Sequence, residues 1–270
     1  MISFRKLNVI FNQGTAMENH AIRGLDLDIN EGEFITVIGS NGAGKSTLLK
    51  SLTGEVQPQG GKVLVDSVDI TNWSTTRRAP WVAHVFQDPM IGTCGDLTIE
   101  ENLALAYRRG QSRAWKARHC LYWAITPSYK EMFREYVSML GLGLESRLGD
   151  QIGRLSGGQR QALSLVMAAI SPMKILVLDE HTAALDPKMA DLVMNLTKKI
   201  VADRNLTVMM VTHSMHQALD SGSRTIMLHQ GKVMFDITGE QRENLDVHGL
   251  LDLFQKHTGT EVDDDKLVLN

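Results

Sequence analysis

This sequence of 270 residues has little cysteine, no long apolar run and no strong excess of one charge. It contains two cysteines, Cys94 and Cys120, in neither a metal-binding nor a redox spacing, which suits a reducing cytosol rather than an oxidising compartment. No uninterrupted apolar run approaches the roughly 18 residues that a membrane-spanning helix needs. The segment MISFRKLNVIF lacks the long apolar core and the cleavage site of a signal peptide, so we expect no export.

The charge balance and the composition narrow the class of protein further. Lys and Arg number 28 against 31 Asp and Glu, which leaves a formal net charge of −3. This balance argues against a protein whose main partner is bare nucleic-acid phosphate, and we expect no nucleic-acid partner. Hydrophobic residues at 43% and charged residues at 22% are ordinary for a folded chain. We therefore expect a soluble α/β protein with one large domain or two small ones.

The periodicity of apolar residues changes twice along the chain. Strands are predicted at residues 7–11, 25–29, 34–38, 62–66 and 82–86. The middle of the chain, from about Leu97 to Val166, is helical in pattern, and Thr98 and Glu101 fit a capping box. Further predicted elements are an apolar helix stripe over 129–140, strands at 175–178 and 206–211, and a helix stripe over 189–200. This alternation predicts a mainly parallel sheet covered by helices, with an inserted helical segment.

A glycine-rich loop stands between the predicted strand 34–38 and the helical segment STLLKSL. It matches the pattern G-x-x-x-x-G-K-[ST], in which glycines let backbone N–H groups point inward around phosphate. Lys45 would place a positive charge on the β- and γ-phosphates, and the Ser46 hydroxyl would face Mg²⁺. The alternative is a plain strand-to-helix turn. The predicted nucleotide-binding residues are Gly39, Ser40, Asn41, Gly42, Ala43, Gly44, Lys45, Ser46 and Thr47.

Two acids close the predicted strand 175–178. Asp179 and Glu180 would lie at the carboxyl edge of a parallel sheet, where ligands gather. Asp179 would hold Mg²⁺, and Glu180 could orient or deprotonate an attacking water. The alternative is a solvated pair of acids that opens a turn. The phosphate loop earlier in the chain makes the metal and water roles the better interpretation.

Together with the phosphate loop, four further short motifs resemble those of ATP-binding cassette (ABC) ATPases. The segment LSGGQ at residues 155–159 resembles the signature motif of that family and lies 24 residues before Asp179. Gln87 in VFQDP resembles the Q-loop, Asp186 in ALD resembles the D-loop, and His213 in VTHSM resembles the switch histidine. Each motif occurs once and in the family's order. For Gln87 and His213 the alternatives are a polar turn residue and an ordinary histidine that ends a strand.

The resemblance implies a head-to-tail homodimer with ATP at two shared sites. Each ATP would lie between the phosphate loop of one chain and the signature segment of the other. Ser156, Gly157, Gly158 and Gln159 would contact nucleotide across that interface, where Asp186 would also lie. Gln87 would sense Mg²⁺, and His213 would contact the γ-phosphate. A helix follows the signature segment, so its N-terminal end favours phosphate charge as well.

Two positions depart from the family's usual pattern. His181 follows Glu180 where many members have proline, a change that could loosen the turn while both acids remain. The aromatic residue that stacks on adenine would here be Phe11, whose ring keeps the π-face of the usual tyrosine and loses only a hydroxyl. The alternative for Phe11 is an ordinary aromatic residue of the core.

The resemblance also implies a domain plan and a class of partner. It implies a P-loop NTPase fold of the ABC ATPase type with an N-terminal antiparallel β subdomain. Residues 1–240 would form the nucleotide-binding domain, 88–151 its inserted helical subdomain, and 241–270 a C-terminal helix with an acidic tail. The partners would be a membrane permease, a second copy of the ATPase and an extracytoplasmic substrate-binding protein, with the chain peripheral at the cytoplasmic membrane face.

Direction of transport and substrate are less well defined by the residues. The segments DEHTAALDP and GEQRENLDVHGLLDLFQK resemble ATPases of tryptophan/tyrosine-type uptake systems, whereas FNQGT and AIRGLDLDI resemble lipoprotein-release and macrolide exporters. A soluble ABC ATPase that does not serve transport, or a module that binds ATP without hydrolysing it, remains an alternative.

Two further surface features are open to more than one interpretation. The basic and aromatic residues between 108 and 123 fit a solvated helix face better than a membrane patch. The apolar stripe of the last helix is expected to pack on the domain.

Overall fold

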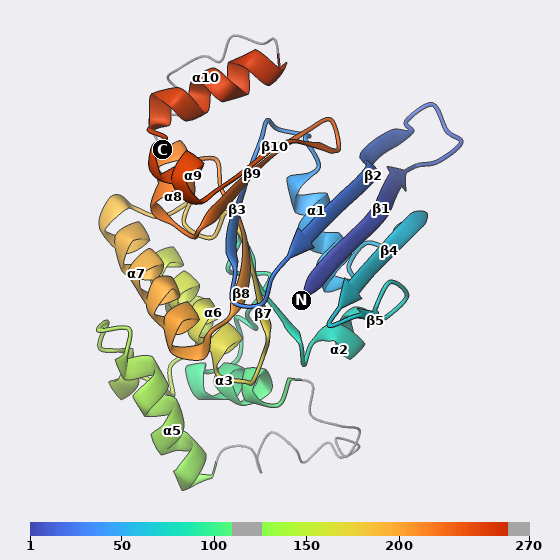
Figure 1. Cartoon of the computed structure of the whole chain (residues 1–270). Coiled ribbons are helices and arrows are strands. Elements are labelled where there is room, and N and C mark those ends of the chain that lie inside the picture. Colours follow the sequence, from blue (N-terminus) through green and yellow to red (C-terminus); the bar gives the residue numbers. More distant parts are fainter. Residues whose placement is uncertain (110–125, 259–270) are drawn as a thin grey trace.

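The computed structural model describes residues 1–109 and 126–258, which form two β-sheets with helices packed around the larger one (Figure 1). Its larger sheet has six strands in the order β10-β9-β3-β8-β7-β6. All neighbouring pairs are parallel except β9 and β10. The strands are β3 Phe34–Ile38, β6 Val82–Val85, β7 Ile175–Asp179, β8 Thr207–Val211, β9 Arg224–His229 and β10 Lys232–Thr238. The mainly parallel sheet predicted from the sequence is confirmed.

Continuous apolar runs explain the centre of this sheet. Every residue of β3 and of β8 is buried, and a strand covered on both faces is enriched in β-branched and aliphatic side chains for that reason. The predicted strands at 82–86, 175–178 and 206–211 agree with β6, β7 and β8 except for one residue at an end of each. The strands β9 and β10 were not predicted.

The smaller sheet is antiparallel and has the order β2-β1-β4-β5. Its strands are β1 Ile2–Phe11, β2 Asn19–Ile29, β4 Gly60–Val65 and β5 Val68–Asp69. The strand β1 is longer than predicted. A register shift between Phe4 and Leu7, where Lys6 has φ 45°, interrupts the alternation of buried and exposed residues. The sequence pattern therefore did not reveal the part of the strand before Leu7. The strand predicted at 62–66 ends at Val65, since Asp66 has φ 48° and belongs to the turn into β5.

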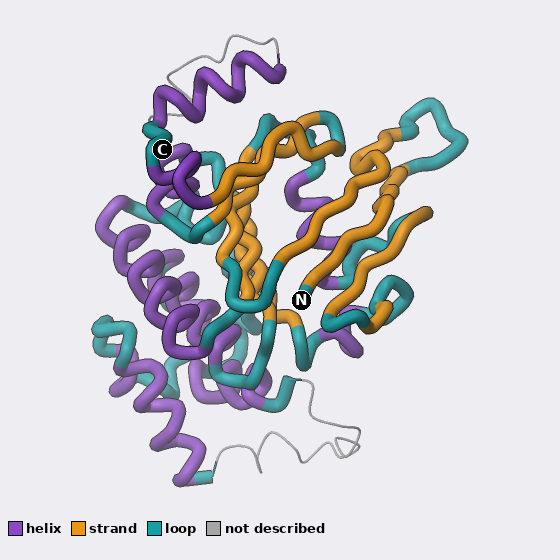
Figure 2. The backbone as a smooth tube through the Cα atoms, viewed as in Figure 1, coloured by secondary structure: helices purple, strands orange, loops and turns teal. Residues whose placement is uncertain are grey.

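Helices cover both faces of the larger sheet, as the purple segments of Figure 2 show. The capping box at Thr98 and Glu101 is confirmed at the start of α3. The helices are α1 Lys45–Thr53, α2 Thr75–Arg78, α3 Ile99–Tyr107, α5 Pro127–Ser138, α6 Gly157–Ala169, α7 Pro187–Arg204, α8 Met215–Asp220, α9 Gly239–Glu243 and α10 Val247–Thr258, with 3-10 turns at Leu144–Ser146 and Ile152–Arg154.

Three apolar clusters hold these layers together. In the first, α1 lies between the two sheets, where Leu48, Leu49 and Leu52 are fully buried (Figure 1). A second cluster joins the other face of the larger sheet to α3, α5, α6 and α7. The third joins α8 and the ends of β3 and β9 to α10. Burial of apolar area at about 25 cal/mol per Å² makes these clusters the main source of stability.

The C-terminal helix packs on the domain as predicted. Leu250, Leu251 and Phe254 of α10 are buried in the third cluster against Met215 and Ala218 of α8. The acidic segment at 263–265 lies outside the described residues. Within the part of the chain that the structure describes, no helix is long and apolar enough to cross a bilayer.

The basic residues between 108 and 123 are described only at Arg108 and Arg109. The prediction of a solvated face is wrong for Arg109, because its Nη2 donates to Ala168 O at 2.9 Å and burial lowers its pKa. The guanidinium of Arg108 lies 6.0 Å from the ring centre of Tyr129. Arg113, Trp115, Lys116, Arg118, Tyr122 and Trp123 fall outside the described residues.

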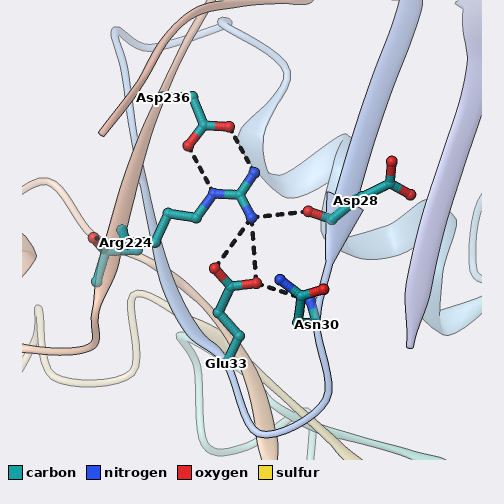
Figure 3. Close-up of polar contacts among 6 residues, drawn as sticks. Asp28, Asn30, Glu33, Arg224 and Asp236 are labelled. Atoms are coloured by element: carbon teal, nitrogen blue, oxygen red, sulfur yellow. Dashed lines mark hydrogen bonds and ion pairs between the residues drawn. The ribbon is translucent and has the colours of Figure 1, made fainter. Parts of the chain in front are cut away.

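One arginine connects the two sheets through hydrogen bonds and ion pairs (Figure 3). Arg224 on β9 donates to both carboxylate oxygens of Asp236 on β10, at 2.7 and 2.6 Å. Its Nη1 also donates to both carboxylate oxygens of Glu33, at 3.1 and 3.2 Å, and to Asp28 O on β2 at 2.9 Å. The hydrogen bonds to Asp236 raise the pKa of Arg224 despite its burial. This cluster ties the β9–β10 hairpin to the turn between β2 and β3.

Candidate functional site

The glycine-rich loop lies between β3 and α1 and is pressed against backbone from two other strands. A Cβ on Gly39 would lie 2.1 Å from Leu228 O, and one on Gly44 would lie 2.5 Å from Ala21 O. Gly39, Gly42 and Gly44 also have φ of 148°, 78° and 104°, which only glycine adopts without strain. Gly44 caps α1 without a side-chain hydrogen bond, so the first N–H groups of α1 remain available to an anion.

Lys45 places a buried charge at the wall of this loop. Its side chain is 6% exposed, and Nζ donates to Gly39 O at 2.7 Å and to Ser40 O at 3.1 Å. Burial lowers the pKa of Lys45, and the charges of Glu180 and Asp179 oppose that shift. A cavity of about 200 Å³ opens beside it, lined by predicted residues from Asn41 to Thr47 together with Glu180 and His213. The Lys45 ammonium and the free N–H groups at the start of α1 suit this cavity to a phosphate group.

Two acids approach the loop from the end of β7. Ser46 Oγ donates to Asp179 Oδ1 at 3.3 Å, and burial raises the pKa of Asp179. Hydroxyl and carboxylate oxygens side by side are ligands that Mg²⁺ prefers. No cluster of three or more His, Cys, Asp or Glu within residues 1–109 and 126–258 could hold a metal, so a cation here would need phosphate oxygens as well.

Glu180 joins residues from three loops at the carboxyl edge of the sheet. Its Oε1 lies 2.7 Å from His213 Nε2, and its Oε2 accepts from Gln87 Nε2 at 3.1 Å. The hydrogen bond from His213 holds the pKa of Glu180 below its usual value. Glu180 has φ 47°, a left-handed conformation that costs about 1–3 kcal/mol in a residue other than glycine. The fold thus aims this carboxylate into the cavity despite backbone strain.

His181 anchors the turn that follows Glu180. It is buried, with Nε2 3.3 Å from Thr197 Oγ1 on α7, and burial lowers its pKa to about 4. Backbone hydrogen bonds from Ala183 N to Glu180 O and from Leu185 N to Thr182 O close the turn. With histidine at this position these two hydrogen bonds close the turn, and the ring is buried.

Phe11 lies at the end of β1 and lines the same cavity. It is 37% exposed, so part of its ring is accessible and it is not an ordinary core residue. Asn19 and Ala21 of β2 line the cavity beside it. Sequence analysis missed both, since no motif marks them and only the pairing of β1 with β2 brings them to the loop.

The signature segment lies elsewhere. Ser156 caps α6: its Oγ accepts from Gln159 N at 3.2 Å, and Gln159 Oε1 accepts from Ser156 N at 3.2 Å. Ser156 and Gly157 are exposed. None of the four signature residues lines the cavity of the phosphate loop, and neither does Asp186. Asp186 instead caps α7 by accepting from Met189 N at 3.1 Å.

Comparisons with known proteins agree with this geometry. A family model described as ABC transporter matches residues 22–183. A tyrosine transport ATP-binding protein of Clostridioides difficile (strain R20291) is 41% identical over 256 residues, which cover 94% of this chain and 99% of that protein. A thiamine import ATP-binding protein, ThiQ, of Yersinia pestis is 32% identical over 82% of this chain and 86% of its own length.

A solved structure shows the same architecture. The ATP-binding cassette MJ0796, as a dimer in a post-hydrolysis state bound to ADP and Pi, superposes with a TM-score of 0.73 and 27% identity. The match covers 88% of this chain and 98% of that cassette. The predicted P-loop fold of the ABC ATPase type, the nucleotide ATP and the ATPase activity are confirmed by these findings together. The chain belongs to the ABC transporter family, as one of its ATP-hydrolysing, ATP-binding proteins.

Proposed function

We propose that two copies of this chain hydrolyse ATP at two shared sites and drive a membrane permease that takes up an amino-acid-like solute. The observation that carries the proposal is the convergence of Lys45, Glu180 and His213 on one cavity of about 200 Å³ beside the phosphate loop. Gln87 joins them through its hydrogen bond to Glu180. These residues come from four separate segments, and together they offer phosphate binding and water activation.

The phosphate loop binds the nucleotide. Free N–H groups at the start of α1 and the Lys45 ammonium meet the β- and γ-phosphates, where a buried charge acts more strongly than in water. Phe11 stacks on the base with the accessible part of its ring. Ser46, Asp179 and Gln87 would hold Mg²⁺, which when bound neutralises phosphate charge during transfer.

Glu180 acts on the attacking water. With a pKa below its usual value the carboxylate is ionised at neutral pH, so it can accept a proton as the water oxygen bonds to the γ-phosphorus. The bond between that phosphorus and the bridging oxygen breaks, and ADP and phosphate leave. His213 holds Glu180 through Nε2 and lies at the cavity wall, where it can contact the γ-phosphate.

The second chain supplies the other side of each site. Ser156 Oγ accepts one hydrogen bond within α6, which leaves its own proton free to donate. The N–H groups of Gly157 and Gly158, in the first turn of α6, have no acceptor within the helix. This exposed donor set fits the γ-phosphate of an ATP held by the partner, with Asp186 nearby. The dimer of the MJ0796 cassette supports this arrangement.

The relatives support a role in uptake. Their names describe tyrosine transport and thiamine import, and the relative named for tyrosine transport matches over nearly the full length of both chains. We therefore assign this chain to an importer with a separate permease and an extracytoplasmic binding protein. The chain would work at the cytoplasmic face of the membrane, with the region 88–151 facing the permease.

Glu180→Gln tests the proposal. This change keeps the shape of the side chain and removes the base, so hydrolysis should fall by about a hundredfold or more, while binding of a fluorescent ATP analogue persists. The trapped nucleotide should then convert monomer to dimer on a sizing column in ATP and Mg²⁺. Normal hydrolysis by this variant would remove Glu180 from the mechanism. Loss of hydrolysis without dimerisation would contradict the shared sites.

A further inference from the structure

The loops that carry Glu180 and His213 are joined by a side chain from outside both. A hydrogen bond from Glu180 N to Val211 O at 3.1 Å joins the ends of β7 and β8. Beyond it the two loops leave the sheet in different directions, one into α7 and the other into α8. Gln217 of α8 spans them. Its Oε1 accepts from Thr212 Oγ1 at 2.9 Å, and its Nε2 donates to Thr182 Oγ1 at 3.1 Å.

The two threonines stand close to the reacting pair in sequence. Thr212 immediately precedes His213, and Thr182 is the second residue after Glu180. They are 4% and 5% exposed, so water competes little for their hydroxyls. The side-chain amide of Gln217 therefore fixes the distance between the backbone segments at Thr182 and Thr212. From these segments the side chains of Glu180 and His213 come within 2.7 Å of each other.

The helix α8 that carries Gln217 is short and is held from both ends. Ser214 caps its start by accepting from Gln217 N at 3.3 Å. At its end, Arg242 of α9 donates through Nη2 to Ala218 O, Leu219 O and Ser221 O at 2.7–2.8 Å. The cation thus meets the free carbonyls where a helix end favours positive charge.

A third contact comes from the core strand before the phosphate loop. Thr36 Oγ1 of β3 donates to Ala218 O at 3.1 Å, and Ala218 itself is fully buried under α10. The position of Gln217 is therefore set by β3, α9 and α10 together, and a six-residue helix becomes a rigid support.

We propose that Gln217 is a positioning residue for hydrolysis, holding the Glu180 carboxylate at the place where it can accept a proton from the attacking water. The inference rests on the roles proposed above for Glu180 and His213. Gln217 does not line the nucleotide cavity, so its removal should lower kcat and leave nucleotide affinity unchanged. Since it acts through Thr182, the two side chains should be coupled.

The test measures kcat and KM for ATP in six variants of the full chain. Gln217→Met keeps the length of the side chain and removes both hydrogen bonds. Thr182→Val removes the hydroxyl with little change of shape, and Thr182→Ser keeps it. The double variant Gln217→Met/Thr182→Val completes a double-mutant cycle, which measures the coupling between the two side chains. His216→Met places the same new residue at the exposed neighbouring position of α8 as the control, and Glu180→Gln is the reference for lost chemistry.

We expect Gln217→Met and Thr182→Val each to lower kcat by about tenfold, less than the roughly hundredfold cost of a 1 Å misplacement of a reacting group. KM and affinity for a fluorescent ATP analogue should stay within about twofold. The double variant should be no slower than the slower single, and Thr182→Ser and His216→Met should hydrolyse as the unmodified chain does.

An unchanged kcat in Gln217→Met, or multiplicative losses in the double variant, would overturn the inference if Glu180→Gln is inactive. Normal hydrolysis by Glu180→Gln would instead refute the proposed function on which the inference rests. If Gln217→Met does not fold, the contrast between Thr182→Val and Thr182→Ser decides, since equal rates in those two would also overturn it.

Discussion

The starts of α1 and α6 are both glycine-containing helix N-termini, yet they are built in opposite ways. At α1 the cap is Gly44, which offers no side chain to the free N–H groups, and the loop before it is pressed against Leu228 O and Ala21 O. At α6 the cap is Ser156, which with Gln159 forms a complete capping box. A buried lysine and two acids surround the first helix start, whereas the second is exposed.

This difference shows what each end can do alone. The α1 end has unpaired donors, a buried cation and a cavity, so it can bind phosphate within one chain. The α6 end stabilises itself through its capping box and presents few remaining donors to the outside. It therefore fits a ligand that another chain already holds. In the proposed function, one protomer would thus contribute two unequal halves to the shared sites.

Removal of Lys45 should have the largest effect of these changes, a loss of nucleotide affinity at the α1 end. In Lys45→Ala the phosphate charge loses its counter-charge in a partly buried site, and affinity for nucleotide should fall by about a hundredfold or more. A fluorescent ATP analogue titrated into the variant measures the loss. Lys198→Ala, at an exposed position on α7, is the control and should bind normally. Unchanged affinity in Lys45→Ala would mean that the α1 end is not the binding half.

The pH dependence of stability tests the turn between β7 and α7, which carries Glu180 and His181. Folding lowers the pKa of His181 from 6.5 to about 4, so the unfolded chain binds more protons than the folded chain between these values. The stabilisation is complete above pH 6.5 and is lost as pH falls toward 4, up to about 3 kcal/mol.

Urea unfolding at several pH values would measure this slope. His181→Gln, whose amide can still donate to Thr197, should lose this part of the slope, and His216→Gln at the exposed position should keep it. An unchanged slope in His181→Gln would show that His181 is not buried as a neutral ring.

The smallest expected effect is a difference in stability between alanine substitutions at two adjacent glycines at the start of α6. A Cβ on Gly158 would lie 2.5 Å from Met189 Cγ, whereas nothing lies within 4 Å of a Cβ on Gly157. Gly158→Ala should therefore destabilise the chain by about 1 kcal/mol through overpacking, and Gly157→Ala should be neutral or slightly stabilising, by about 0.5 kcal/mol. Thermal unfolding measures both. Equal effects would contradict the packing of Met189 on α6, and Met189→Ala should relieve the cost in Gly158→Ala.

Local sequence patterns predicted the buried strands β3 and β7 and the loops that follow them. The buried run of β3 followed by glycines predicted both a central strand and the phosphate loop after it. The acids at the end of β7 were placed correctly at the carboxyl edge of the sheet. The prediction succeeded here because neighbouring residues determine a buried strand and the turn that ends it.

Features that depend on distant contacts were missed or misjudged. Arg109 was expected in solvent, but its partner Ala168 O is supplied by α6. The left-handed φ of Glu180 has no sequence signal, because residues other than glycine rarely adopt it and glutamate is not among the residues enriched there. Gln217 resembles any polar helix residue until folding places it between Thr182 and Thr212. Only tertiary structure brings such groups together.

In the proposed dimer, the start of α1 in one chain and the start of α6 in the other form one site. The most direct test of this claim mixes a Lys45→Ala chain, whose phosphate loop is dead, with a Ser156→Arg chain, whose signature end is blocked. Each variant alone should hydrolyse ATP at a negligible rate. In the mixture, one shared site combines an intact phosphate loop with an intact Ser156, so part of the ATPase rate should return. A rate that never exceeds the sum of the two separate variants would contradict the claim and show that each chain works alone.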